Sequence, residues 1–207
     1  MKDHRNWGFD LPNGSRVVHG TGAGIKTPFP QFTLEMHELS RGGRPFEGQF
    51  GMIPFCTEYR MPRHVHIGEN PVSGEPELLA ERILVMNGVG LLELAGVLYV
   101  LPPRTLIDIA PGLPHTWTAC PEGLELPDGS VSTGRFDMIY QYERTTGFTP
   151  VRDCGLISRV EECRPHDGPI EEVFFPRLSL TEVIAGADLV WSRDIIPLYA
   201  KHTVATG

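Results

Sequence analysis

The sequence predicts an all-β fold, a small antiparallel β-barrel of the jelly-roll kind. The chain has 207 residues and contains 23 Gly and 19 Pro, so turns are frequent and long helices are disfavoured. Within residues 31–150, short apolar runs are separated by Asn-Gly, Ala-Gly, Pro-Pro and Pro-Gly pairs. Turn signals at a spacing of about 8–12 residues are typical of a β-sandwich or β-barrel.

The first strands can be placed in order. Residues 1–30 are polar and Gly-rich, and we expect an irregular N-terminal arm with a short strand near 16–19. The stretch "QFTLEMHEL" (31–39) alternates as a strand does, and "FEGQFGMIPFCTEYR" (46–60) predicts one strand or two joined by a bend. The next strand is "RHVHI" (63–67).

Further short apolar runs follow an interruption rich in Pro and Gly at residues 67–80. This interruption is expected to be an insertion at the end of the barrel, either a lid or an ordinary surface loop. We expect a hairpin turn at Asn87-Gly88 and another at Ala95-Gly96. The runs predicted to be strands are "ERILVMNG", "VGLLELAG", "VLYVL", "TLIDIAPG", "HTWTAC" and "RFDMIYQYE".

The character of the chain changes after the predicted barrel, residues 31–150. Residues 151–207 are broken and polar at first, and they are too few to form a good core alone. Ser179 and Glu182 fit a capping box, which predicts one helix near 180–191. We therefore expect a C-terminal extension with a short helix that packs on the barrel.

Composition and charge restrict the class of partner. With 18 Lys and Arg against 26 Asp and Glu, the net charge is −8, which argues against nucleic acid and anionic membranes. No apolar run reaches the roughly 18 residues of a membrane span, and the first ten residues lack an apolar signal core. A cytoplasmic location is expected from the lack of a signal core. A homodimer is expected because sheet edges readily pair. Free thiols are expected at Cys56, Cys120, Cys154 and Cys163.

Three histidines and one glutamate are the candidate functional residues. His64 and His66 share one face of a strand, and they converge on one point if that face is the barrel interior. Glu81 opens the next strand, where an inward carboxylate is costly unless it is paired or bound to a metal. His115 follows a Pro-Gly turn and opens another strand. Taken singly, the histidines also fit a surface or core pair, and Glu81 also fits an exposed strand end.

These residues and their spacing resemble the motifs of the cupin family, G(x)5HxH(x)3-4E(x)6G and G(x)5PxG(x)2H(x)3N. His64 and His66 match the HxH core, and Glu81 followed by Gly88 matches E(x)6G. Residues 112–115 match the G(x)2H part of the second motif. The resemblance implies a small antiparallel barrel with a metal inside it.

The resemblance also implies the ligands, His64, His66, Glu81 and His115. One divalent metal per chain is expected, with iron first, while zinc, manganese, nickel or copper also suit a donor set of three nitrogens and one oxygen. The chain departs from the family in several places. Fourteen residues separate His66 from Glu81 where three or four are usual. Glu58 and Arg104 stand where the two motifs open with Gly, Pro111 directly precedes Gly112, and Ala119 replaces the closing Asn. Glu69 is the alternative ligand, but it lies in the turn sequence "GENP".

Cupins with this ligand set resemble non-haem dioxygenases, decarboxylases and sugar isomerases, and others only bind small molecules. We expect a mononuclear metal-dependent dioxygenase that acts on a small aromatic or enolisable substrate chelated to the metal. The alternatives are a redox-neutral decarboxylase, isomerase or lyase, and a non-catalytic binding protein. The fold does not choose between them.

Residues near the motifs are candidates for lining the substrate pocket, although for each one taken singly ordinary core packing, or a solvated position for the arginine, is the more common role. Glu58 and Tyr59 are the candidates for acid–base catalysis. The expected pocket residues are Trp117, Tyr59, Tyr140, Met138 and Arg60.

Overall fold

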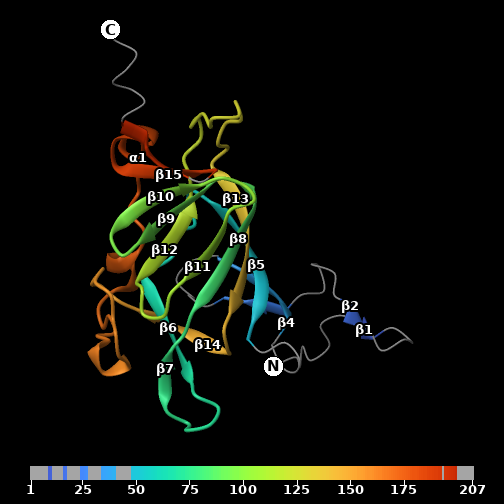
Figure 1. The fold of residues 1–207 in the computed structure, drawn as a ribbon, viewed down its shortest axis with the longest axis vertical. Helices are drawn as coiled ribbons and strands as arrows, with labels where there is room; N and C mark the ends of the chain where they lie inside the picture. The colour runs from blue at the N-terminus through green and yellow to red at the C-terminus, as the bar shows by residue number, and fades with distance from the viewer. Residues whose placement is uncertain are drawn as a thin grey trace.

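Two sheets facing each other form the body of the protein in the computed structural model (Figure 1). Among the residues that the structure describes, all strand pairs are antiparallel except the β10–β15 pair. This architecture confirms the predicted all-β jelly roll. The structure describes residues 9–10, 16–17, 24–27, 34–40, 48–192 and 194–199.

The first sheet has eight strands in the order β14-β6-β12-β9-β10-β15-β16, with β7 paired to β6. It contains the strands expected to carry the three histidines. Its strands are β6 (His64–Glu69), β7 (Pro76–Leu78), β9 (Gly90–Leu94), β10 (Val97–Leu101), β12 (His115–Ala119), β14 (Thr146–Pro150), β15 (Ala187–Trp191) and β16 (Asp194–Pro197).

The second sheet has six strands in the order β11-β8-β13-β5-β4-β3. Strand β3 lies within the predicted N-terminal arm but pairs with β4 as part of this sheet. A separate two-stranded ladder joins β1 (Phe9–Asp10) and β2 (Arg16–Val17). The six strands are β3 (Gly24–Lys26), β4 (Met36–Ser40), β5 (Phe50–Cys56), β8 (Glu81–Gly88), β11 (Leu106–Ile109) and β13 (Arg135–Tyr142).

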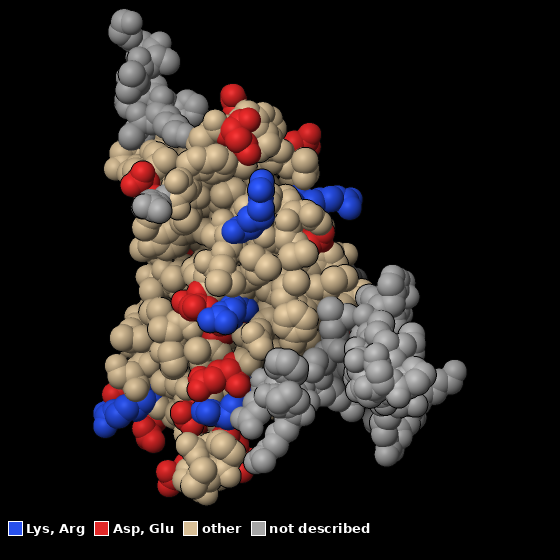
Figure 2. All heavy atoms as spheres, turned by 45° about the vertical axis from the view of Figure 1, so that its right-hand side comes forward, with Lys and Arg blue, Asp and Glu red and all other residues tan. Residues whose placement is uncertain are grey.

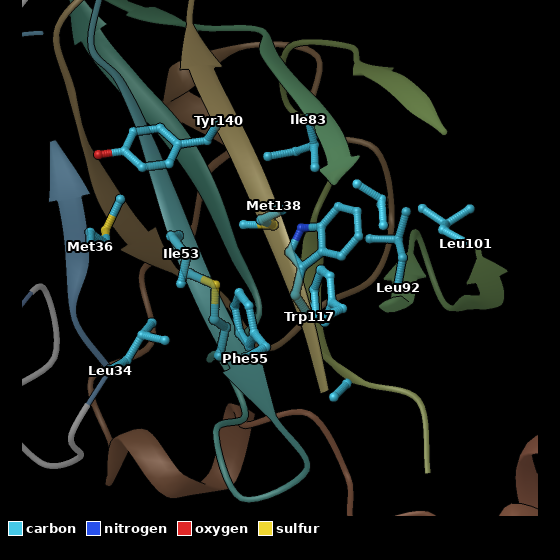
Figure 3. Packing of buried hydrophobic residues seen from close by; sticks show 14 of the residues in the cluster. Leu34, Met36, Ile53, Phe55, Ile83, Leu92, Leu101, Trp117, Met138 and Tyr140 are labelled. Atoms are coloured by element: carbon cyan, nitrogen blue, oxygen red, sulfur yellow. The ribbon is translucent and has the colours of Figure 1, made fainter. Parts of the chain in front are cut away.

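The main core lies between the two sheets (Figure 3). Alternate residues of each strand point inward, because successive side chains of a strand leave on opposite faces. Strand β13 shows this alternation along its length, with exposed or half-buried positions between buried ones. Side chains central to this core are Met36, Ile53, Phe55, Ile83, Leu92, Trp117, Phe136, Met138 and Tyr140.

Two predicted turns have different outcomes. Ala95 and Gly96, with φ of 49° and 83°, close the hairpin between β9 and β10 as predicted. The hairpin predicted at Asn87-Gly88 is wrong, because β8 and β9 belong to different sheets. Gly88, with φ of 64°, instead lies where the chain crosses between the sheets. A Cβ there would collide with the carbonyl oxygen of Arg135, so the crossing requires glycine.

The C-terminal segment adds strands to the eight-stranded sheet. The capping box of Ser179 and Glu182 is present and starts α1 (Leu180–Gly186), but the helix ends five residues before the predicted limit of 191. Those five residues form β15, which pairs in parallel with β10 and buries Leu189. Tertiary pairing therefore overrides the helical pattern. Among the described helices, none is long and apolar enough to cross a membrane.

The insertion at residues 67–80 extends β6 and forms a hairpin with β7. It projects at the lower end of the molecule in Figure 1. Asn70 organises its tip, since its side-chain oxygen accepts hydrogen bonds from the backbone N–H groups of Val72 and Ser73. Val72 at this tip is 94% exposed.

Candidate metal centre

The four predicted ligands converge between the two sheets. Their ligand atoms all lie within 4.8 Å of one another, and the side chains are only 1–4% exposed. His64 and His66 lie on β6, and His115 begins the neighbouring β12, where it is paired in register with His64. Glu81 begins β8 in the facing sheet. Three imidazoles from one sheet therefore meet one carboxylate from the other.

Hydrogen bonds to backbone carbonyls fix the orientation of each imidazole. His64 Nδ1 lies 2.8 Å from the Pro62 oxygen, and His115 Nδ1 lies 2.8 Å from the Leu113 oxygen. His66 Nδ1 lies 3.1 Å from a third carbonyl oxygen, on β14. A carbonyl only accepts, so each Nδ1 carries the proton and donates it. Each Nε2 of a neutral imidazole is then an unprotonated lone pair, the form that binds metals.

The atoms at the centre are left without hydrogen-bond partners. His66 Nε2, His115 Nε2 and Glu81 Oε2 are buried and unsatisfied. They nevertheless lie close together, with Glu81 Oε2 at 3.3 Å from His66 Nε2 and 2.9 Å from His115 Nε2. Buried acceptors that face one another are unfavourable unless a cation lies between them. The donor set therefore fits a divalent metal ion.

The electrostatics favour the protonation states that a metal requires. Burial, reinforced by His115 and His66, lowers the pKa of His64 well below its usual value, which keeps the imidazole neutral. Burial alone would raise the pKa of Glu81, but positive charge beside the carboxylate, from protonated His66 and His115 or equally from a bound cation, lowers that pKa below its usual range. The centre thus favours a neutral imidazole at His64 and an ionised carboxylate at Glu81.

Two aromatic side chains that the sequence analysis did not single out border the cluster. The Phe148 ring on β14 lies 4.7 Å from that of His64, and the Tyr142 ring on β13 lies 4.5 Å from that of His66, both between centroids. Tyr142 could have been found, because it is two residues from Tyr140 and shares its strand face. Phe148 gave no signal, since strand pairing alone brings it to the site.

Three of the predicted pocket residues face the interior. Trp117, Met138 and Tyr140 are at most 1% exposed (Figure 3). Trp117 Nε1 and the hydroxyl groups of Tyr140 and Tyr142 are buried without hydrogen-bond partners. Burial is the main cause that raises the pKa of both tyrosines, so both hydroxyls stay protonated. Tyr59 is half-buried and packs against the same core.

The structure does not bring Arg60 and Glu58 to the cluster. Arg60 Nη1 donates to the Phe175 carbonyl oxygen at 2.8 Å, and its guanidinium lies 5.6 Å from the centroid of the Phe174 ring. Both contacts are to the C-terminal segment. Glu58 is exposed and accepts a hydrogen bond from Arg177 Nη1 at 2.9 Å. The expected pocket role of Arg60 and acid–base role of Glu58 therefore have no support from geometry.

The choice between the two glutamates is clear. Glu81 is in the cluster, whereas Glu69 is an exposed residue at the end of β6, next to the hairpin tip. Glu81 reaches the centre because β8 begins beside Tyr142 of β13, and both residues face inward from the six-stranded sheet. The insertion between the two motif parts lengthens the chain without moving the ligand.

Two facing antiparallel sheets with three histidines and a glutamate converging between them define the class of this protein. It has a cupin fold with a metal-site cluster of three imidazoles and one carboxylate. No protein-family model and no curated protein sequence matches the chain.

Solved structures similar to this chain include known cupins. An ethanolamine utilization protein Q from Salmonella typhimurium is 11% identical with a TM-score of 0.44, over 65% of this chain and 90% of that one. An RmlC-like cupin from Ralstonia eutropha is 11% identical with a TM-score of 0.43, over 69% and 76%. HppE is 16% identical with a TM-score of 0.41, over 64% of this chain and 60% of its own. Similarity at this level carries no information on activity.

Proposed function

We propose that this protein is a mononuclear metal-dependent enzyme of the non-haem dioxygenase type, acting on a small aromatic or enolisable substrate that chelates the metal. One observation carries the proposal. The Nε2 atoms of His66 and His115 and the Oε2 atom of Glu81 are buried, unpartnered and aimed at one point, and His64 completes the set. Iron is the proposed metal, and zinc, manganese, nickel or copper also suit the donors.

The ligand set leaves room for chemistry. Three neutral imidazoles and one carboxylate leave a divalent ion with a net positive charge and open coordination positions, where it would supply Lewis acidity and, as iron, one-electron redox chemistry. The chain's own contribution is to hold the donors rigidly and to exclude water. Phe148, Tyr142 and Trp117 give the surroundings an aromatic, apolar character, which suits an aromatic ring better than a sugar.

Two tyrosines carry protonated hydroxyls in the buried surroundings of the cluster. Tyr142 lies beside His66 and Tyr140 beside Tyr142, with ring centroids 4.5 and 5.1 Å apart. Because both hydroxyls are buried and protonated, each has a proton to donate to an oxygen of a bound substrate. The Tyr142 hydroxyl also favours a second candidate function, a redox-neutral lyase or isomerase in which Tyr142 serves as general acid.

The reaction type is tested by metal analysis followed by a substrate screen in air and under argon. The proposal expects about one divalent metal per chain and oxygen consumption when iron(II) and a diketone or catechol are present. Turnover that continues under argon would favour the redox-neutral candidate instead. Tight substrate binding without turnover in either atmosphere would contradict both and indicate a binding protein.

Ligand substitutions test the metal centre itself. We expect His115→Ala to lower metal affinity at least about 100-fold, because it removes a donor from a set of four. Glu81→Gln removes the only carboxylate of the cluster and should weaken binding strongly, whereas the matched Glu69→Gln should leave it unchanged. Metal content by mass spectrometry, with circular dichroism to confirm folding, measures all three. Equal loss in the two glutamine variants would refute the assignment of Glu81.

A further inference from the structure

The two sheets approach each other along one edge that borders the metal centre. In the described part of the chain, β3 is the last strand of the six-stranded sheet and β14 is the last strand of the other path. Strand β14 pairs with β6, which carries His64 and His66. We call the border between β3 and β14 the barrel edge. A group that lies there is placed to contact a ligand bound to the metal.

Lys26 on β3 extends from the inner face of the sheet at this barrel edge. It is the registered partner of Met36 on β4, whose side chain is fully buried in the main core. Directly opposite residues of an antiparallel pair extend from the same face of the sheet. The Lys26 side chain is only 31% exposed. Lysines mostly lie in solvent, so an inward lysine beside a metal centre requires an explanation.

One aromatic side chain connects Lys26 with the metal ligands. Lys26 Nζ lies 5.6 Å from the centroid of the Phe148 ring. That ring lies 4.7 Å from the ring of His64 and 5.2 Å from the ring of His66, between centroids. The ammonium group is therefore no farther from the His64 ring than the two steps through Phe148 allow. A substituted benzene ring bound to the metal can cover this length.

A buried carboxylate holds the ammonium group loosely. Glu38 Oε1 lies 3.8 Å from Lys26 Nζ, which is an ion pair but longer than a hydrogen bond. Gln49 Nε2 donates to the same oxygen at 3.0 Å, and Gln49 Oε1 accepts from the Thr146 N–H of β14 at 3.1 Å. Glu38 and Gln49 are 7% and 8% exposed. The carboxylate is thus fixed across the barrel edge, whereas its pairing with Lys26 uses none of the three ammonium donors in a hydrogen bond.

The molecule as a whole does not attract anions. Its net charge is −8. On the face that Figure 2 shows, the Lys and Arg side chains stand singly among acidic ones and do not gather in a basic patch. A field of this sign repels a negatively charged ligand at long range. Selection of an anion at the metal centre therefore requires a local cation, and Lys26 is placed to be one.

We propose that Lys26 is a specificity residue that binds a carboxylate of the substrate, and that the substrate is a small aromatic acid. The inference rests on the proposed function, from which it takes the ring chelated to the metal. The chelating oxygens and the carboxylate would lie on opposite sides of this ring, with the ring against Phe148. Glu38 neutralises the ammonium in the free protein. A hydrogen bond from an ammonium to a carboxylate is charge-assisted and stronger than a neutral one.

Binding of two matched rings to the iron(II)-loaded full-length protein under argon tests the proposal. Catechol and 3,4-dihydroxybenzoate differ only in the carboxylate, and calorimetry gives the Kd of each. The wild type should bind the acid at least about 10-fold more tightly than catechol. Lys26→Met keeps the aliphatic stem and should remove most of this preference without changing the Kd of catechol. Lys26→Arg should retain it.

Arg177→Met is the matched control. Arg177 is exposed and pairs with Glu58, which the structure does not bring to the metal cluster, so this variant should keep the wild-type preference. Metal content and thermal unfolding confirm that each variant is intact. If Lys26→Met loses metal, Lys26→Gln decides. A wild type that binds the two rings equally, prefers catechol or binds neither overturns the inference. So does a metal-loaded Lys26→Met or Lys26→Gln variant with the full wild-type preference.

Oxygen consumption in air distinguishes this inference from the proposed function. If both rings are consumed with the same kcat/KM by the wild type and by Lys26→Met, the dioxygenase stands and the role of Lys26 is refuted. If the acid binds in a Lys26-dependent way but no oxygen is consumed, the role of Lys26 stands and the dioxygenase is refuted.

Discussion

The two sheets of the barrel differ in what covers their outer faces. Behind the eight-stranded sheet, Leu91, Val100 and Cys120 point away from the core and are at most 1% exposed, because the C-terminal segment packs over them. Behind the six-stranded sheet, the outward positions are half-buried, or about half exposed at the two ends. We call this set the outer row: Ile25, His37, Met52, Ile139, Leu84 and Leu106. One sheet is thus completed by its own chain, and the other presents an apolar surface that nothing in the described residues buries.

This difference matters for the metal centre. The covered sheet supplies all three histidines, and apolar clusters on its far side pack against β6, which carries His64 and His66, and against β9 and β10. The open sheet supplies only Glu81. Metal ligands need support that fixes them to within a fraction of an ångström, and a packed layer behind the strands provides it.

The largest expected effect comes from matched leucines on the two outer faces. We expect Leu91→Ala to cost about 3 kcal/mol of unfolding free energy, because it opens a cavity beneath the C-terminal segment. Leu84→Ala, at a half-buried position of the outer row, should cost about 1 kcal/mol or less in the monomer. Urea unfolding at low protein concentration compares them. Equal costs for the two leucines would mean that both outer faces are covered.

The second prediction compares two ion pairs on these faces. Arg63 binds Glu93 through two hydrogen bonds, of 2.9 and 2.7 Å, and donates a third to the Arg152 carbonyl oxygen. Glu93 is 5% exposed, so Arg63→Ala leaves an uncompensated carboxylate under the C-terminal segment and should cost about 3 kcal/mol. Arg82→Ala breaks an exposed pair on the open face and should leave stability indistinguishable from wild type.

Denaturant unfolding of both alanine variants, with Arg63→Met as a control for the aliphatic stem, measures this contrast. Arg63→Met keeps the packing of the side chain but not the charge, so it should resemble Arg63→Ala. A small cost for both Arg63 variants would show that water reaches Glu93 and that the C-terminal cover is loose. The comparison between the two faces would then lose its physical basis.

Much of the fold and the ligand set could be predicted from sequence because the signals are local. The HxH spacing places two imidazoles on one strand face, and the turn residues mark the strand ends. The family resemblance supplied the other two ligands, because it grouped Glu81 and His115 with these two histidines. The choice of Glu81 over Glu69 rested on the strand that follows it, and the cluster contains Glu81.

The rest depends on contacts between distant segments, which no local pattern encodes. Residues 187–191 look like the end of a helix until they are seen pairing with β10. Phe148 reaches the metal centre only because β14 pairs with β6. Arg60 looks like a pocket residue from its place beside the histidines, but the C-terminal segment offers it a carbonyl and a ring. The outer row is likewise invisible until the register of six strands is known.

The smallest expected effect concerns two free thiols. All four cysteines are unpaired, as predicted, and Cys120 lies under the C-terminal cover, where burial raises the pKa of its thiol to about 12. At pH 8 almost no thiolate forms there, so Cys120 should resist iodoacetamide in the folded protein. Cys56, half-buried at the end of β5 in the open sheet, should be alkylated first. Peptide mass spectrometry over time measures the alkylation of both cysteines, and denaturant should make the two alkylation rates equal. Early alkylation of Cys120 without denaturant would show that the C-terminal segment opens readily, and the two faces would then differ in composition but not in protection.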